Sequence, residues 1–156
     1  MTHVRTQLRN AIKTRLSTVP SVKGAYNMTR HARDFQADNY PAALIAVTEA
    51  SSPNPGGLIG QRPVTRRYKI DIQIGVDEDE VDAEDIIDSV CVDVEKALVL
   101  PPAGIGQISN WAYSGTTAID GQPTSGGMLL VETMTYTCEI QTLDSAPDTN
   151  LHTQSR

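Results

Sequence analysis

Strict two-residue alternation over residues 64–76 constrains the fold of this chain more than any other feature. The segment reads VTRRYKIDIQIGV. One face carries Val64, Tyr68, Ile70, Ile72, Ile74 and Val76. Such alternation predicts a strand with one buried face and one face in water. At about 3.3 Å per residue the strand would be about 43 Å long, so we expect part of it to bend or to project beyond its sheet.

Two other segments have the spacing of amphipathic helices. Within the first 18 residues, Val4, Leu8 and Ile12 recur every four positions, and Val19-Pro20 ends the pattern. A strip of basic residues adjoins this apolar stripe: Arg5, Arg9 and Lys13. The second helix follows the acidic run at residues 77–85, where Asp82 is a candidate N-cap.

Shorter apolar segments predict the remaining strands. We expect a short strand within residues 22–28, a buried strand at 42–48, and a hairpin formed by residues 109–119 and 128–141. Within the hairpin, Glu132 interrupts an otherwise apolar row. Helices that do not alternate regularly with strands favour an α+β fold. The prediction is an antiparallel β-sheet with long strands and two helices packed on one face.

Size and hydropathy are those of one domain with an aliphatic core. The chain has 156 residues, of which 39% are hydrophobic and only 4% aromatic. No apolar run approaches the roughly 18 residues that a membrane span needs, so no membrane partner is expected. After Leu143 the sequence is polar and patternless. We therefore predict a single domain over residues 1–143 and a disordered C-terminal tail over 144–156.

Charge is divided unevenly along the chain. Residues 1–76 contain eleven Lys or Arg against four acids, whereas residues 77–156 contain fifteen acids against two bases. The halves thus carry +7 and −13, which sum to the net −6. Segregated charge favours contact between the positive surface of one copy and the negative surface of another. The alternative is that folding mixes the two halves in space and leaves no charged flanks.

Residues 49–63 read EASSPNPGGLIGQRP, with three prolines and three glycines. That density predicts a long loop without regular structure. Leu58 and Ile59 lie at its centre, and we expect them to be exposed. The residues predicted to contact a partner are Asn54, Gly57, Leu58, Ile59 and Arg62.

Candidate catalytic and metal-binding patterns are weak. The run DEDEVDAEDIID at residues 77–88 has carboxylates, but it lacks the central glycine and the final glutamate of a calcium loop. His3, His31 and His152 have no companion nucleophile or acid at a useful spacing. Cys91 and Cys138 fall on apolar faces and are expected to be buried thiols. We therefore expect neither a cofactor nor an enzyme activity.

Taken together, the layout resembles that of the tail terminator (tail completion) proteins of long-tailed bacteriophages. Four features over residues 2–143 carry the resemblance: TQLRNAIKTRL, ALIAVTEASSPNPGGLIGQRPVTRRYKIDIQIGV, DAEDIIDSVCVDVEKAL and GGMLLVETMTYTCEIQTL. They correspond to a short helix, a strand–loop–strand unit, a helix opened by acids and a final long strand. No catalytic motif accompanies them.

The resemblance implies a virion protein at the neck end of the tail. Such proteins form a hexameric ring on the finished tail tube, stop its polymerisation and present the surface that the head–tail connector joins. The implied partners are further copies of the chain, the tail tube protein and the connector, with DNA crossing the lumen without specific binding. Charge separation predicts the subunit interface at Arg66, Arg67, Lys69, Asp77, Glu78, Asp79, Glu80 and Asp85.

Three alternatives remain open on the sequence alone. A neck or head–tail connector protein of the same machinery also forms rings. From a different class, a metal-dependent enzyme would use the carboxylates of residues 77–88. A host interaction module is the third.

Overall fold

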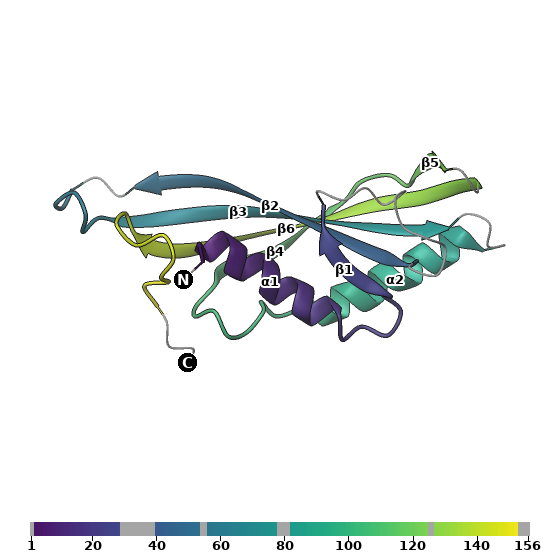
Figure 1. The fold of residues 1–156 in the computed structure, drawn as a ribbon, viewed down its shortest axis with the longest axis horizontal. Helices are drawn as coiled ribbons and strands as arrows, with labels where there is room; N and C mark the ends of the chain where they lie inside the picture. Colours follow the sequence, from purple (N-terminus) through teal and green to yellow (C-terminus); the bar gives the residue numbers. More distant parts are fainter. Residues whose placement is uncertain (1, 29–39, 54–55, 78–81, 125–126, 153–156) are drawn as a thin grey trace.

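The computed structural model describes residues 2–28, 40–53, 56–77, 82–124 and 127–152 (Figure 1). Two helices and six strands follow one another along the chain: α1 (Val4–Leu16), β1 (Gly24–Asn27), β2 (Ala42–Pro53), β3 (Pro63–Asp77), α2 (Ala83–Ala97), β4 (Ser109–Thr116), β5 (Asp120–Thr124) and β6 (Gly127–Leu143). The molecule is elongated, and its long strands run along the long axis (Figure 1).

The strands form one mixed sheet in the order β1-β2-β3-β6-β4, with β5 also paired to β6. All pairs are antiparallel except β1–β2, which is parallel. The α+β class, the long strands and the two helices are as predicted from the sequence. The parallel pair was not anticipated, because the pattern of a four-residue strand does not indicate its direction.

Strand β3 confirms the alternation pattern but does not project beyond the sheet. Its pairing with β6 runs from Pro63 opposite Leu143 to Asp77 opposite Leu129, over the whole strand. Of the two expected outcomes, bending or projection, projection does not occur, because β6, at 17 residues, is longer than the 15-residue β3. The three long strands twist together, and their two ends splay apart in Figure 1.

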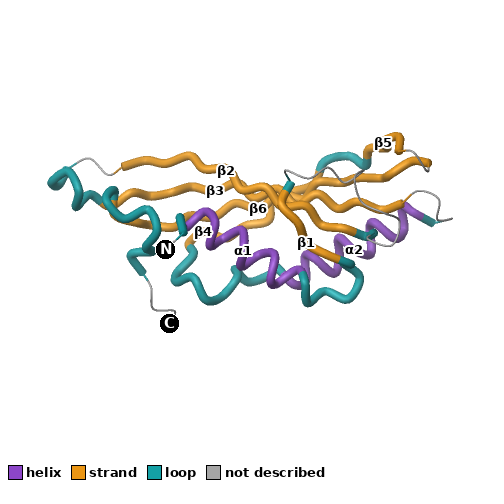
Figure 2. The backbone as a smooth tube through the Cα atoms, viewed as in Figure 1, coloured by secondary structure: helices purple, strands orange, loops and turns teal. Residues whose placement is uncertain are grey.

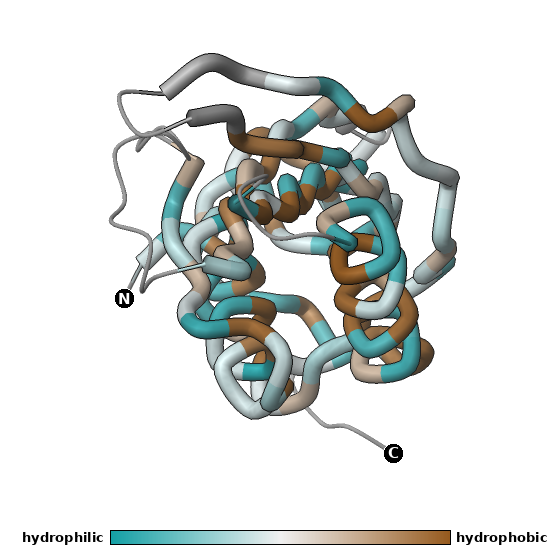
Figure 3. Tube along the Cα trace, turned by 90° about the vertical axis from the view of Figure 1, so that its right-hand side faces the viewer, coloured by the Kyte–Doolittle hydropathy of each residue, from teal (hydrophilic) through white to brown (hydrophobic). Residues whose placement is uncertain are grey.

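Both helices pack on the same face of the sheet and lie roughly end to end beneath it (Figures 1 and 2). Helix α1 buries Val4, Leu8, Ile12 and Leu16 in the same core cluster that holds the apolar row of β3. Helix α2 contributes the buried residues Ala83, Ile87, Val90, Cys91 and Val94 to that cluster. Seen along the long axis, the helices and the sheet form two layers that both contain hydrophobic segments (Figure 3).

A smaller apolar cluster lies on strand positions of opposite parity. Leu44 of β2 packs with Leu129 and Val131 of β6, and all three are buried. Their neighbours in sequence, Ala43 and Leu130, belong to the main core. Because successive side chains on a strand point to opposite faces, this cluster covers the other face of the sheet. The sheet is thus buried on both faces where β2 and β6 carry Leu44, Leu129 and Val131.

The predicted loop at residues 49–63 is shorter than expected. Residues 49–53 extend β2 and pair with β3, from Glu49 opposite Tyr68 to Pro53 opposite Val64. Similarly, β5 occupies part of the turn-rich stretch at 120–127. The loop prediction was wrong over residues 49–53 because pairing with a long neighbouring strand outweighs local composition, and proline is tolerated where a strand lies at a sheet edge.

The predicted disordered tail does not match the structure over residues 144–152. Asn150 is buried, and its Nδ2 donates to the carbonyls of Ile105 and Gln107, each at 3.0 Å. The amide of Val4 donates to Pro147 O at 3.0 Å. Residues 144–152 therefore belong to the folded domain, and 153–156 lie outside the described residues. Polar composition misled the prediction, since these contacts satisfy backbone groups rather than bury apolar area.

No helix in the described part of the chain is long and apolar enough to cross a membrane.

Candidate functional site

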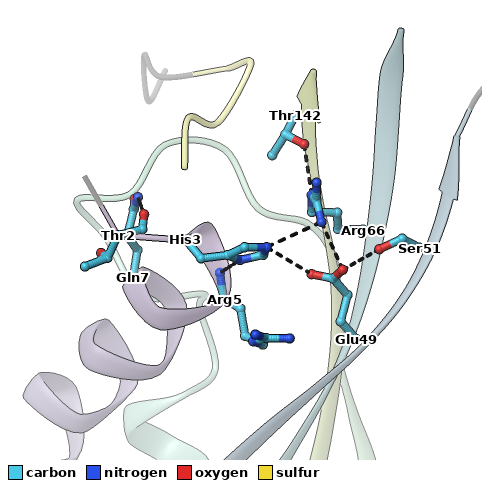
Figure 4. A network of polar contacts seen from close by, with 8 residues as sticks. All are labelled: Thr2, His3, Arg5, Gln7, Glu49, Ser51, Arg66 and Thr142. Carbon is cyan, nitrogen blue, oxygen red and sulfur yellow. Dashed lines mark hydrogen bonds and ion pairs between the residues drawn. The ribbon is translucent and has the colours of Figure 1, made fainter. Parts of the chain in front are cut away.

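Arg66 lies on the buried face of β3 and forms a polar network under the start of α1 (Figure 4). Its Nη1 donates to Glu49 Oε2 at 2.9 Å, and its Nε donates to Thr142 Oγ1 at 2.9 Å. Only 9% of Arg66 is exposed. The guanidinium of Arg66, predicted to lie at the subunit interface, is thus paired and covered within the protomer. Even-numbered residues of β3 share this face, which the alternation pattern itself indicated.

His3 links this network to α1. Its Nδ1 accepts from the amide of Arg5 at 3.0 Å and so caps the helix. The neutral ring then carries its proton on Nε2, which lies 4.0 Å from Glu49 Oε1. Burial, aided by the nearby arginines Arg66 and Arg5 and opposed by Glu49, lowers the pKa of His3. A neutral His3 keeps its capping nitrogen free of a proton.

The Glu49 carboxylate is stabilised in its charged form. Burial alone would raise its pKa, but the hydrogen bond from Ser51, the nearby hydroxyl of Tyr68 and the charge of Arg66 outweigh burial, so the pKa lies below its usual value. Burial and the neighbouring Glu49 carboxylate raise the pKa of Tyr68, whose ring belongs to the main core. The network of His3, Glu49 and Arg66 thus links the start of α1 to the sheet through charged and polar contacts.

The other two basic residues predicted for the interface are exposed but paired within the protomer. Arg67 Nε donates to Glu139 Oε1 at 3.2 Å, and Lys69 Nζ lies 3.9 Å from Asp71 Oδ2. Both side chains keep 60% exposure. They line an open groove of about 480 Å³ on the sheet face away from the helices. Because their partners are acids of the same chain, β3 supplies less free positive charge than the sequence suggested.

The helices instead carry the segregated charge. Helix α1 has four basic residues and no acid, whereas α2 has five acids and one lysine, so their net charges are +4 and −4. Their C-terminal ends meet where Arg15 Nη1 donates to Ala97 O at 2.9 Å. The helices therefore present opposite charge toward opposite ends of one molecular face (Figure 1). The strip of Arg5, Arg9 and Lys13 was the sequence signal for the basic end.

The acidic residues predicted for the interface are only partly described. Asp77 ends β3, and Asp85 is exposed in the first turn of α2. Glu78, Asp79, Glu80 and also Asn54 of the loop lie outside the described residues. Asp82 occupies the N-cap position of α2, but its side chain makes no capping hydrogen bond. Among residues the structure describes, no group of three or more His, Cys, Asp or Glu is arranged to hold a metal ion.

The described part of the loop projects beyond β2 and β3 at one end of the molecule (Figure 1). Leu58 and Ile59 are 70% and 85% exposed, as expected. Asp144 braces the loop, because its two carboxylate oxygens accept from the amides of Gly60 at 2.9 Å and Arg62 at 3.2 Å. Gly60 has φ +92°, a conformation that favours glycine. The apolar tip is therefore held outward by a defined scaffold.

A groove between α2 and β4 was missed by the sequence analysis. Its volume is about 380 Å³, and it is lined by Glu95, Leu98, Val99, Trp111, Tyr113 and Tyr136. Trp111 stacks on Tyr136 with ring centroids 5.3 Å apart, and its Nε1 donates to Leu98 O at 2.7 Å. Burial and the Glu95 carboxylate raise the pKa of Tyr113 to about 12. The three aromatic residues were visible in the sequence, but their convergence depends on the pairing of β4 with β6.

Glu132 is a second buried carboxylate, on the apolar row of β6 that faces α2. It is 8% exposed, and its Oε2 has no hydrogen-bond partner. Burial raises its pKa, the side chain of Thr116 opposes this shift, and the nearby carboxylates Asp88 and Glu95 raise the pKa further. The α2 end of the molecule therefore holds more negative charge than it neutralises.

A scan against protein-family models and a search of curated proteins found no match to this chain. Function is therefore inferred from the surfaces described above.

Proposed function

We propose that the protein is a non-enzymatic virion protein that assembles head to tail into a ring, as the tail terminator of a long-tailed bacteriophage. The observation that carries the proposal is the opposite charge of α1 and α2 on one face of the molecule. The resemblance of its helix and strand layout to the tail terminator family supplies the biological setting.

Opposite charge at two ends of one face favours contact between unlike surfaces. Two copies related by a two-fold axis could place α1 of each copy against α2 of the other, which would give a closed dimer. A head-to-tail contact instead places the basic helix of one copy near the acidic helix of the next. Repeated with a constant rotation, such a contact closes into a ring. A hexamer is the ring size that the resemblance implies.

The remaining surfaces suit a ring at the end of a tube. The braced loop tip at residues 56–62 offers exposed apolar side chains for the tail tube protein or a neighbouring subunit. A net charge of −6 is compatible with a lumen that DNA crosses without being held. The opposite surface of the ring would be the site at which the connector joins the head.

The direct test is to add the purified chain to tail tube protein during tube polymerisation. Tubes are then measured by negative-stain electron microscopy, with the chain labelled at its C-terminus. We expect shorter tubes with label at one end only. Unchanged tube length with no end label would contradict the proposal. Label confined to the connector of intact virions would instead identify a neck protein.

A further inference from the structure

Exposed large apolar residues gather at two places in the described part of the chain. At the tip of the loop are Leu58 and Ile59. Between α2 and β4 are Val99 and Tyr113, 70% and 45% exposed, while the exposed Val92 lies on α2 and Leu100 follows Val99 in the chain. The first place is convex and the second includes the groove of about 380 Å³. Clustered exposed apolar residues mark interaction surfaces more often than scattered ones do.

The groove has the composition of a binding surface for an apolar side chain. Tyr136 forms its floor between Trp111 and Tyr113, with ring centroids 5.3 Å and 5.2 Å away. Trp and Tyr are the residues that most often dominate binding energy at protein interfaces. The rim is acidic, because Glu95 lines the groove and no basic residue does. A ligand of matching chemistry would combine aliphatic side chains with a cation.

The loop tip has that chemistry and is already ordered for it. Leu58 and Ile59 supply two aliphatic side chains, and Arg62 supplies a guanidinium beside them. Arg62 Nε donates to Gly57 O at 3.2 Å, so the arginine is held across the base of the tip. The brace from Asp144 fixes the same turn. A segment ordered before binding loses less conformational entropy when it binds.

The two surfaces lie apart in one protomer. The loop projects at the left-hand end of Figure 1, whereas α2 occupies the right-hand half. Since the brace holds the loop outward, a match between tip and groove requires two copies.

We propose that the loop tip of one copy, Leu58 and Ile59 with Arg62, inserts into the α2–β4 groove of the next copy. This contact rests on the proposed ring and names the surfaces that join its subunits. The contact is heterologous, as closure of a ring requires. Its charges match those of the helices, because the loop tip that inserts carries the basic Arg62 and the groove that receives it carries the acidic Glu95.

A cysteine pair tests the contact directly. Ile59→Cys and Val99→Cys in one chain should form disulfides between copies under mild oxidation and give a ladder of linked species on a non-reducing gel. The matched control combines Ile59→Cys with Thr14→Cys, an exposed position on α1. Background from the native thiols is low, since burial raises the pKa of Cys91 and Cys138 to about 12. We expect a ladder with Val99→Cys and at most dimers with Thr14→Cys.

Trp111 provides a second readout because it is the one tryptophan of the sequence. On assembly, wild-type emission should shift to shorter wavelength as apolar side chains cover the ring. The double substitution Leu58→Ser, Ile59→Ser should remove the shift and weaken self-association about tenfold or more. Ile119→Ser is the control, since Ile119 is 37% exposed outside both surfaces; it should behave as wild type.

The outcomes separate this contact from the proposed function. If sedimentation shows that the chain assembles, but the two cysteine pairs give equal ladders or neither gives a ladder, the loop–groove contact is wrong and the proposed ring still stands. A chain that stays monomeric even with tail tubes present would overturn both. A ladder specific to Val99→Cys without end-binding to tubes would support the contact and contradict the terminator role.

Discussion

The two ends of the sheet each bury a carboxylate beneath a helix, but only one end neutralises it. At the α1 end, Glu49 is paired with Arg66 at 2.9 Å and its pKa is lowered despite burial. At the α2 end, Glu132 has an unpartnered oxygen, and burial together with Asp88 and Glu95 raises its pKa. Glu49 and Glu132 each have one oxygen without a hydrogen-bond partner, so the two ends differ in the cation: Glu49 lies beside Arg66, whereas Glu132 forms no ion pair with the residues that the structure describes.

The ion pair at the α1 end stabilises the fold of one protomer, whereas the unpaired acids at the α2 end could be neutralised by a second copy. The Arg66 network anchors α1 and leaves the outer basic residues of that helix free to act between molecules. The acids around Glu132 repel one another, and a basic surface brought against α2 would lower that repulsion. The predictions below test whether the two ends differ in this way.

The largest effect should follow loss of the buried ion pair. Arg66→Met leaves Glu49 buried without its cation, and we expect a loss of about 3 kcal/mol in the free energy of unfolding. Arg67→Met is the matched control, since Arg67 is adjacent on β3 and pairs with Glu139 at the surface; it should cost less than about 1 kcal/mol. Urea denaturation measures both. Equal losses would show that the α1 end is not anchored by this pair.

At the α2 end, removal of the buried charge should increase the free energy of unfolding rather than decrease it. Glu132→Gln removes a buried charge that has no cation, and we expect a gain of about 1 kcal/mol at neutral pH. Glu49→Gln, the same change at the other end, should instead destabilise the protein. Chemical denaturation of the two variants compares the ends directly. A loss of stability in both would mean that Glu132 has a stabilising partner in the fold.

The pH dependence of stability should also differ between the ends. A raised pKa means that the contribution of Glu132 is fully present below the unfolded value of 4.5 and is lost as pH rises through the folded pKa. The advantage of Glu132→Gln should therefore shrink as the pH falls from neutral toward 4.5. For Glu49, whose pKa is lowered, stabilisation is lost as pH falls through the folded pKa. Denaturation at pH values above and below 4.5, with each Gln variant against wild type, checks the signs: on acidification the advantage of Glu132→Gln and the disadvantage of Glu49→Gln should both shrink, and growth of either one contradicts the account.

The smallest effect should come from the loop tip. Leu58→Ser with Ile59→Ser changes side chains that are 70% and 85% exposed, so stability should change by less than about 0.5 kcal/mol. A thermal melt at a concentration where the protein is monomeric measures this. A large loss would show that the tip packs within its own protomer.

Periodicity predicted those parts of the fold that a buried face defines. The apolar rows on β3 and β6 and the apolar stripe on α1 could be predicted without knowing which elements pack against them, because burial of one face imposes their spacing. Residues 144–152 and the extension of β2 were missed, since hydrogen bonds between backbone groups hold them, to the following strand for β2 and to more distant segments for 144–152. Such contacts leave no period in the sequence.

The candidate surfaces were predicted unevenly for a related reason. Exposure of Leu58 and Ile59 followed from loop composition, and the basic strip of α1 followed from its spacing. The burial of Arg66 was not anticipated, because grouping it with the neighbouring charges ignored the alternation of side chains along the strand. The groove required Trp111 and Tyr136 to meet across β4 and β6, which depends on a register that bulges shift.

Complementary charge reversal tests the central claim most directly. One variant carries Arg5→Glu and Lys13→Glu on α1, and the other carries Asp85→Lys and Asp88→Lys on α2. Sedimentation velocity is run on each variant alone and on an equimolar mixture in dilute salt. Head-to-tail contact between the helices predicts weakened association of each variant alone and recovered association in the mixture. If each variant alone associates as strongly as wild type, the opposite charges of the two helices do not join the subunits.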